Sequence, residues 1–320
     1  RPPDSPQTNV LPGMGPPGTP LMGNSDGDHH ATPPPSAGKL FAWAGLRFRL
    51  PAGWETGQLG ADHGWLESDF KPVLEFKTAI VKGRFSFRRQ LKQLAQESPL
   101  QVQLEKLPVS WRSHLTAFET QAFSWQGPRV AGTGIVLYCP DCHRVTLMQF
   151  YRTGASLSAF APVLASFDDH GPGRRPTVAV YDLQVTVPPT LPLKRFRFDS
   201  GRFELVFGTR RRQVTLWRWS PADAALRYHG GSLSNFAGQN GLPSDPPVTS
   251  RRFRQGREWR WGAMMPWKDR LKRRIQRRLP PQAFRIWHQT ETNRILAARW
   301  DGAWDRNRFE EICSSYEIIS

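Results

Sequence analysis

The sequence predicts an α+β protein built from two tandem antiparallel sheet domains with flanking helices. Three observations support this fold class. Short runs alternate apolar and polar residues, which is typical of half-buried strands. A few segments change to helical spacing, with apolar residues three and four positions apart. A stretch at 135–167, interpreted as strand, tight turn, strand, loop and helix, is repeated in outline at 284–316.

Residues 1–39 are predicted to form a disordered tail. Pro, Gly, Ser and Thr dominate this segment, and large apolar residues are nearly absent. Such a composition cannot bury enough apolar surface to offset the entropy lost on ordering. We therefore expect the first domain at 40–168, a linker rich in Gly and Pro at 169–176, and the second domain at 177–320.

The first domain is expected to open with a strand at Phe41–Pro51, ended by its proline. Further strands are predicted at Gly64–Glu67 and Val73–Lys77. Helical spacing of apolar residues then predicts an amphipathic helix at Ser86–Gln96. Strands resume at about Leu115–Trp125, and the hairpin and helix of the repeated stretch close the domain.

The second domain repeats these features at a nearly constant offset. Asp182–Pro188 matches Gly45–Pro51 in alternation and in its final proline, and Gly201–Glu204 matches the strand at Gly64–Glu67. Apolar residues at 233–237 again have helical spacing. Matches that keep one offset over so long a stretch indicate an internal duplication.

The largest departure between the two copies is a predicted basic helical insert at 264–282. Apolar residues recur there every fourth position, with prolines at both ends, so an amphipathic helix with a wide cationic face is expected. Such helices bind anionic membranes, acidic proteins or phosphate backbones. The alternative is a helix packed on its own sheet with its arginines in water. The predicted partner-binding residues are Trp267, Lys268, Arg270, Lys272, Arg273, Arg274, Arg277 and Arg278.

The formal net charge of +17 and the pI of about 10.7 favour polyanionic partners. We expect an acidic protein complex or an anionic membrane surface, with nucleic acid also possible. Uncharged apolar runs are too short for a transmembrane helix. The protein is therefore expected to be soluble or peripheral, in a bacterial cytoplasm or periplasm.

The order of elements resembles the PsbP-like fold. The residues that carry the resemblance are the opening Leu46–Trp54 and the closing Phe160–Phe167. It covers 40–168 well and 177–320 more loosely, because the insert and the missing Gly-Trp after Pro188 depart from the pattern. The resemblance implies an antiparallel sheet with helices on its flanks and a non-catalytic accessory or docking role.

The motif Cys139-Pro-Asp-Cys142-His143 has four interpretations. It matches a c-type haem attachment site, with His143 as iron ligand. It also matches a zinc knuckle, in which His143 would be a third ligand and Cys313 a fourth if the two domains face each other. As an oxidised pair, the two cysteines would form a small redox loop or a staple. Finally, Pro and Asp at these positions suit a plain hairpin turn.

Motifs for nucleotide binding, serine hydrolysis and metalloprotease chemistry are absent from the sequence. We therefore expect no catalytic residues, no enzyme activity and no cofactor, with haem c or zinc as the alternative. The function expected from the sequence is that of a non-enzymatic accessory protein that docks on an acidic partner.

Overall fold

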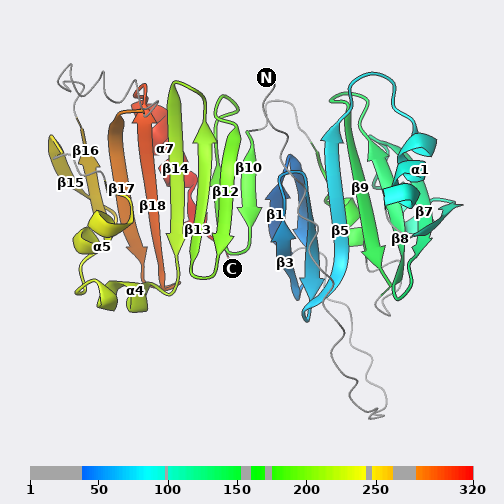
Figure 1. The fold of residues 1–320 in the computed structure, drawn as a ribbon, viewed down its shortest axis with the longest axis horizontal. Coiled ribbons are helices and arrows are strands. Elements are labelled where there is room, and N and C mark those ends of the chain that lie inside the picture. Colours follow the sequence, from blue (N-terminus) through cyan, green and yellow to red (C-terminus); the bar gives the residue numbers. More distant parts are fainter. Residues whose placement is uncertain are drawn as a thin grey trace, which may run out of the picture. The chain divides into compact units, whose positions relative to one another are not determined.

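The computed structural model describes residues 38–97, 100–152, 160–169, 175–242, 247–261 and 279–319 (Figure 1). Within these residues the paired strands run antiparallel, and helices lie against the sheets. This arrangement confirms the α+β class. The predicted tail at 1–39 lies outside the described residues except for its last two positions, and Lys39 already begins the first strand.

The first half of the chain contains a seven-stranded sheet with the order β3-β4-β5-β9-β8-β7-β6. The bounds are β3 Trp54–Leu59, β4 His63–Ser68, β5 Lys71–Ile80, β6 Gln101–Glu105, β7 Glu119–Gln126, β8 Ala131–Tyr138 and β9 Arg144–Tyr151. The central strands β8 and β9 are buried along most of their length. Their apolar residues therefore face packed layers on both sides of the sheet.

The second half repeats this strand order in a second seven-stranded sheet, β12-β13-β14-β18-β17-β16-β15. The bounds are β12 Leu193–Asp199, β13 Arg202–Gly208, β14 Arg212–Trp219, β15 Thr249–Phe253, β16 Gly256–Arg260, β17 Pro281–Gln289 and β18 Arg294–Gly302. Each strand of the first sheet thus has a counterpart at the same place in the second. Most of the predicted insert lies outside the described residues, between β16 and β17.

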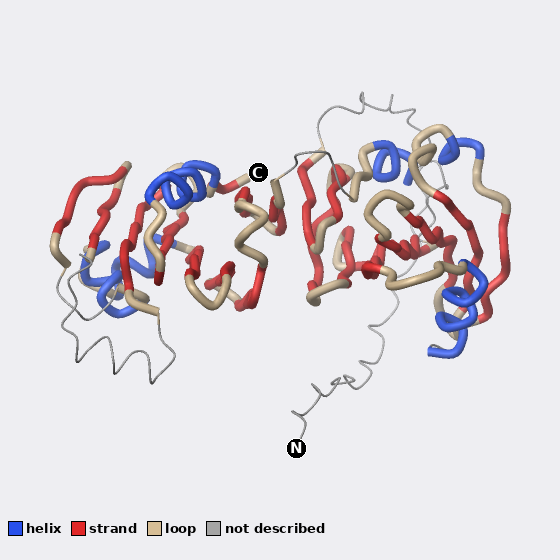
Figure 2. The backbone as a smooth tube through the Cα atoms, turned by 90° about the horizontal axis from the view of Figure 1, so that it is seen from above, coloured by secondary structure: helices blue, strands red, loops and turns tan. Residues whose placement is uncertain are grey.

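Helices cover both faces of each seven-stranded sheet (Figure 2). In the first half, α1 (Phe87–Glu97) packs on one face through Leu91, and α2 (Val109–Arg112) and α3 (Ala161–Ala165) lie on the other. Leu91 joins a cluster that contains Phe123 and Val136. The amphipathic spacing of α1 places its apolar stripe on this cluster and its arginines in solvent.

In the second half, α7 (Arg306–Ser315) packs on one face, and α4 (Ala222–Tyr228) and α5 (Leu233–Asn240) pack on the other. The Asp305 side chain accepts a hydrogen bond from the backbone N–H of Arg308 at 3.2 Å and so caps the start of α7. This cap fixes where α7 begins, and Phe309 and Ile312 follow on its buried side.

A separate five-stranded sheet, β19-β11-β10-β1-β2, combines strands from both halves. The bounds are β1 Lys39–Trp43, β2 Leu46–Leu50, β10 Thr177–Val180, β11 Leu183–Thr186 and β19 Glu317–Ile318. Ala42 of β1 pairs with Ala179 of β10. Each alanine belongs to the second-to-last residue pair before the turn of its own hairpin, β1–β2 or β10–β11. Equivalent residues therefore face each other, as in a two-fold symmetric interface.

The main hydrophobic core includes residues of both halves. The rings of Trp43 and Phe196 meet edge to face at 4.9 Å, and the Tyr181 hydroxyl donates to the Gly57 carbonyl at 2.7 Å. Burial and the Glu67 carboxylate raise the pKa of Tyr181 to about 12, so the phenol keeps its proton for this bond. Asp169, the first residue of the predicted linker at 169–176, is also buried.

Candidate functional site

The Cys139-to-Arg144 segment forms the turn between β8 and β9. The backbone N–H of Cys139 donates to the Arg144 carbonyl at 2.9 Å and closes the turn. His143 adopts a left-handed conformation with φ 54°. Cys139 is 1% exposed, whereas Cys142 is half-buried at the rim of the turn. The hairpin turn predicted from the sequence is therefore present, and within the described residues neither cysteine forms a disulfide bond.

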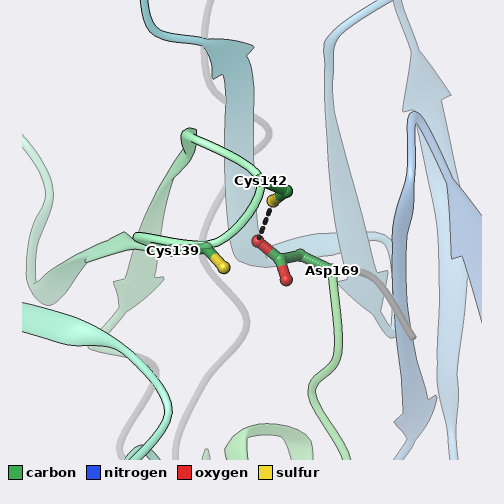
Figure 3. Close-up of side chains that lie close together, drawn as sticks. All are labelled: Cys139, Cys142 and Asp169. Carbon is green, nitrogen blue, oxygen red and sulfur yellow. Dashed lines mark hydrogen bonds between the residues drawn. The ribbon is translucent and has the colours of Figure 1, made fainter. Parts of the chain in front are cut away.

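Asp169 brings a carboxylate to the two thiols (Figure 3). Asp169 lies shortly after the end of α3. The preceding residue, Asp168, is fixed by a bridge to Arg47 through two backbone hydrogen bonds of 2.8 Å. The Cys142 thiol donates to the Asp169 Oδ2 at 3.6 Å. The ligand atoms of Cys139, Cys142 and Asp169 all lie within 4.8 Å of one another. We call these three residues the thiol–carboxylate cluster.

The thiol–carboxylate cluster keeps Cys142 protonated at neutral pH. Burial raises the pKa of the Cys142 thiol to about 11, a hydrogen bond from the backbone N–H of Arg144 opposes this rise, and the Asp169 carboxylate adds to it. A thiolate is the form that attacks disulfides or binds metals. Cys142 therefore ionises less readily than an ordinary cysteine.

His143 and Cys313, the two additional ligands considered from the sequence, lie elsewhere. The His143 Nδ1 is hydrogen-bonded to the Tyr138 hydroxyl at 2.9 Å, and the side chain is exposed. Cys313 is fully buried in α7, and this burial raises its pKa to about 12. The structure thus joins Cys139 and Cys142 to Asp169 and not to His143. This arrangement suits a small ion better than a porphyrin held by His143.

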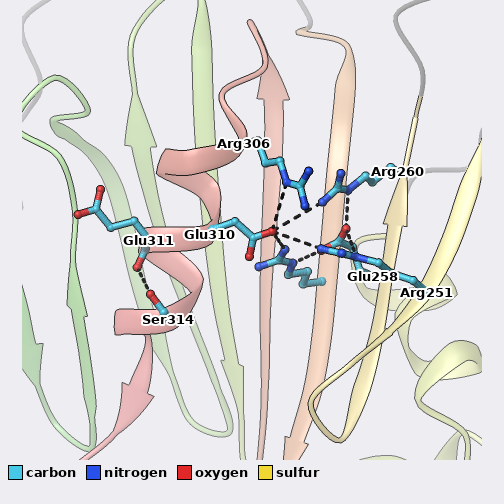
Figure 4. Close-up of polar contacts among 8 residues, drawn as sticks. Arg251, Glu258, Arg260, Arg306, Glu310, Glu311 and Ser314 are labelled. Carbon is cyan, nitrogen blue, oxygen red and sulfur yellow. Dashed lines mark hydrogen bonds and ion pairs between the residues drawn. The ribbon is translucent and has the colours of Figure 1, made fainter.

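A second cluster of charges lies under α7 in the second half (Figure 4). Glu258 of β16 and Arg285 of β17 are both 0% exposed and form an ion pair. Arg251 and Arg260 donate to Glu258 at 2.9 Å and 2.5 Å, and Arg285 also donates to Glu310 of α7 at 2.5 Å. We call these residues the buried ion network.

The buried ion network stabilises the charged form of each partner. Burial alone would raise the pKa of Glu258, but hydrogen bonds and charge from Arg251, Arg285 and Arg260 outweigh it and lower the pKa. The hydrogen bond from Arg285 likewise lowers the pKa of Glu310. Phe253 and Phe309 lie against the Arg285 guanidinium at 4.2 Å and 4.9 Å. The network is therefore a packed structural unit that reaches solvent only at its rim.

The hairpin of β15 and β16 carries exposed arginines at the edge of the second sheet. Arg252 and Arg257 face each other directly across the two strands, and Arg254 lies in the turn. Within the part of the chain that the structure describes, none of these three arginines forms an ion pair. We call Arg252, Arg254 and Arg257 the edge arginines.

Tryptophans next to the edge arginines face inward. Trp259 and Trp261 are each 7% exposed and pack in the cluster under α5. Aromatic rings stack on nucleic-acid bases only through an exposed ring face, and these two rings are buried. The edge arginines are exposed, and the Arg254 guanidinium lies over the rings of Phe253 and Trp287 at 5.5 Å and 5.4 Å.

The eight residues predicted to bind a partner, from Trp267 to Arg278, lie outside the described residues. The charge distribution around them is still informative. Residues 177–320 carry 26 Lys and Arg against 13 Asp and Glu, whereas residues 40–168 carry 14 against 10. The two halves share a strand order but differ in charge, so the excess charge is not a requirement of the fold.

The sequence did not point to Asp169 or Glu258 as site residues. Asp169 was counted as linker, since a Gly- and Pro-rich neighbourhood follows it. Glu258 alternates with Trp259 and Arg260 along β16, and a charged residue in such a strand normally faces water. The feature that identifies Glu258 is its place directly opposite Arg285 on the neighbouring strand. That pairing depends on strand register, which the sequence does not show.

Among the helices that the structure describes, none combines the length and apolar character required to cross a membrane. No protein-family model matches the chain, and no curated protein matches it. A crystal structure of a protein from Bacteroides thetaiotaomicron VPI-5482 is weakly similar, with 16% identity and a TM-score of 0.29. The match covers 47% of this chain and 53% of that one, so this chain spans about half of that protein's length.

Proposed function

We propose that this chain is a non-enzymatic binding protein of two PsbP-like units that docks through its second half on a surface dense in anionic groups. The observation that carries the proposal is the charge difference between two halves of equal strand order, 26 basic against 13 acidic residues in one and 14 against 10 in the other. Folding imposes no such difference, whereas attraction to a polyanion grows with each added cation.

The edge arginines support this proposal. Like charges directly opposite each other on neighbouring strands destabilise a sheet. Arg252 and Arg257 have this arrangement and are both exposed. An anionic partner placed between the two guanidinium groups would convert this repulsion into attraction. Arg252 lies on β15, Arg257 on β16 and Arg254 in the turn between them, and the basic segment 262–278 begins two residues after β16 ends.

The test uses the full chain and vesicles that contain anionic lipid, with heparin and duplex DNA as parallel arms. A triple variant, Arg252→Gln, Arg254→Gln and Arg257→Gln, removes the edge arginines. Each Lys or Arg near an anionic membrane contributes about 1 kcal/mol, so vesicle affinity should fall roughly 100-fold. The salt dependence of binding should become shallower, because fewer counterions are released.

A matched control removes three exposed arginines from the first half, Arg84, Arg88 and Arg89, by the same change to Gln. This control has the same net charge as the edge variant and should keep most of the affinity. Equal losses in both variants would show that binding follows net charge alone and would contradict a docking surface in the second half. Binding only to DNA would assign the anionic partner to nucleic acid.

The predicted insert is tested by changing Lys268, Arg270, Lys272, Arg273, Arg274, Arg277 and Arg278 to Gln. Substitution is preferable to deletion, because β17 begins at Pro281 and Trp261 donates its backbone N–H to the Gln282 carbonyl at 3.0 Å. If this segment is the main contact, the loss of affinity should exceed that of the edge variant. An unchanged affinity would restrict the docking surface to the described hairpin.

A further inference from the structure

The geometry points to a zinc site formed by Cys139, Cys142 and Asp169 in the first half. We propose that the thiol–carboxylate cluster binds one thiophilic divalent ion, with Zn²⁺ as the expected ion. The inference is independent of docking on a polyanion. It differs from the ligand set that the sequence suggested, since Asp169 takes the place considered for His143.

The distances in the thiol–carboxylate cluster match a tetrahedral zinc site. With bonds of about 2.3 Å to sulfur and about 2.1 Å to oxygen, a sulfur and an oxygen ligand lie about 3.6 Å apart. The Cys142 sulfur and the Asp169 Oδ2 are 3.6 Å apart. The ligand atoms of all three residues lie within 4.8 Å of one another. Zinc therefore needs only a small inward adjustment of the third ligand.

The backbone holds these ligands in place from two separate segments. The β8–β9 turn is closed by the hydrogen bond from Cys139 to Arg144, and the backbone N–H of Arg144 also donates to the Cys142 sulfur. Asp169 is positioned by the backbone bridge between Asp168 and Arg47. A site with ligands on a tight turn and on a segment held by a backbone bridge is preorganised for an ion.

The second half shows that the fold does not require these residues. The corresponding turn between β17 and β18 carries Gln289 and Thr292 where the first half has the two cysteines. Ile318, two residues after Tyr316, corresponds to Asp169, two residues after Phe167. Three ligand residues thus converge in one copy, and none of their counterparts is a thiol or carboxylate.

The ligand chemistry selects the ion. Two cysteine sulfurs favour zinc over magnesium or calcium, which prefer oxygen ligands alone. Three protein ligands leave a fourth position of the tetrahedron for a water molecule or an exogenous group. Cys142 is half-buried while Cys139 and Asp169 are buried, so the open position faces the rim of the turn.

The experiment titrates the reduced full-length chain with Zn²⁺ and with Co²⁺, whose absorption reports thiolate ligands and tetrahedral geometry. Wild type should bind one equivalent. Cys142→Ser and Asp169→Asn each remove a direct ligand of the ion. Each should therefore weaken Zn²⁺ binding by more than the loss of about 10- to 100-fold that follows removal of an outer-shell partner. Asp169→Cys should still bind the ion and should strengthen the sulfur-to-cobalt absorption. This variant tests the site even if Asp169→Asn folds poorly.

Two matched controls sharpen the result. His143→Gln changes the neighbouring residue of the same turn, and Cys313→Ser removes the remaining cysteine; both should bind Zn²⁺ like wild type. Failure of the wild-type chain to bind Zn²⁺ or Co²⁺ would overturn the proposal. So would wild-type affinity in Asp169→Asn together with a loss in His143→Gln, or a haem Soret band on the protein purified from cells.

Discussion

The two seven-stranded sheets bury different kinds of side-chain pair at equivalent positions. Ile135 of β8 and Arg285 of β17 lie equally far from the turns that follow these strands, and their neighbours across the sheet are Ala122 and Glu258. The first sheet buries an apolar pair there, and the second buries an ion pair. The comparison teaches that this strand order constrains side-chain volume and register but not polarity, provided that a buried charge finds partners.

The largest effect on this comparison is expected from Glu258→Gln. The change leaves the Arg285 charge, which is 0% exposed, with Glu310 as its remaining carboxylate. Breaking a buried ion pair from one side costs about 3–5 kcal/mol. Urea denaturation should show this loss in the free energy of unfolding.

The control for this prediction copies the first sheet into the second. The double variant Glu258→Ala, Arg285→Ile reproduces Ala122 and Ile135 and should be about as stable as wild type, because a packed apolar pair often replaces a buried ion pair without loss. A double variant less stable than Glu258→Gln would show that the second sheet depends on the ion network itself.

The next largest effect is expected at the turn of the first hairpin of each half, β1–β2 and β10–β11. Gly45 and Asp182 occupy equivalent positions in these two turns. Arg144 donates to the Ala44 carbonyl at 2.8 Å in the first half, whereas Arg218 and Arg294 donate to the Asp182 carboxylate in the second. Asp182→Asn should cost about 1.5–3 kcal/mol, the usual range for hydrogen bonds to a charged group. Thermal and urea unfolding measure this cost.

The pH dependence of stability tests the same carboxylate. Burial alone would raise the pKa of Asp182, but hydrogen bonds from Arg218 and Arg294 outweigh it and lower the pKa. Its contribution is therefore complete above the unfolded pKa of about 3.9 and is lost as the pH falls through the lower folded value. Asp182→Asn should lose less stability than wild type over that acid range. Parallel pH profiles would contradict the assignment.

A smaller effect is expected from Gly134→Ala in β8. An added Cβ would lie 2.1 Å from the Phe123 ring, whereas the second sheet carries Phe284 at the corresponding position, opposite Trp259. Overpacking of this kind costs about 1–3 kcal/mol. Adding Phe123→Leu should recover part of the loss. As a control, Gly238→Ala in α5 meets nothing within 4 Å and should stabilise the protein.

The smallest effect is expected from Arg252→Glu. The change replaces a like-charge pair with an opposite-charge pair across β15 and β16, and should stabilise the protein by about 0.2–1 kcal/mol. The same variant should bind anionic vesicles more weakly than wild type. Higher stability with weaker binding is the expected combination, and a loss of both would mean that Arg252 has a structural role.

Local patterns in the sequence predicted several elements closely, but the single strand expected at Phe41–Pro51 is a hairpin of β1 and β2. The helix expected at Ser86–Gln96 is α1, Phe87–Glu97, and the strand expected at Val73–Lys77 lies within β5. The strand expected from Leu115 begins only at Glu119, because Leu115 is drawn into the core just after α2. The short helix α4 was not predicted, since only Ala222 of its residues is buried and its apolar stripe is weak.

The sequence alone determined the alternation of the strands, the turn at Cys139–His143, the repeated order of elements and the basic character of the second half. Only the tertiary structure decided that β1 and β10 meet in a shared sheet, that Asp169 approaches the two cysteines, and that Glu258 faces Arg285. The physical reason is range. Periodicity and turn chemistry act between residues close in sequence, whereas strand partners and buried charge pairs depend on which distant surfaces pack together.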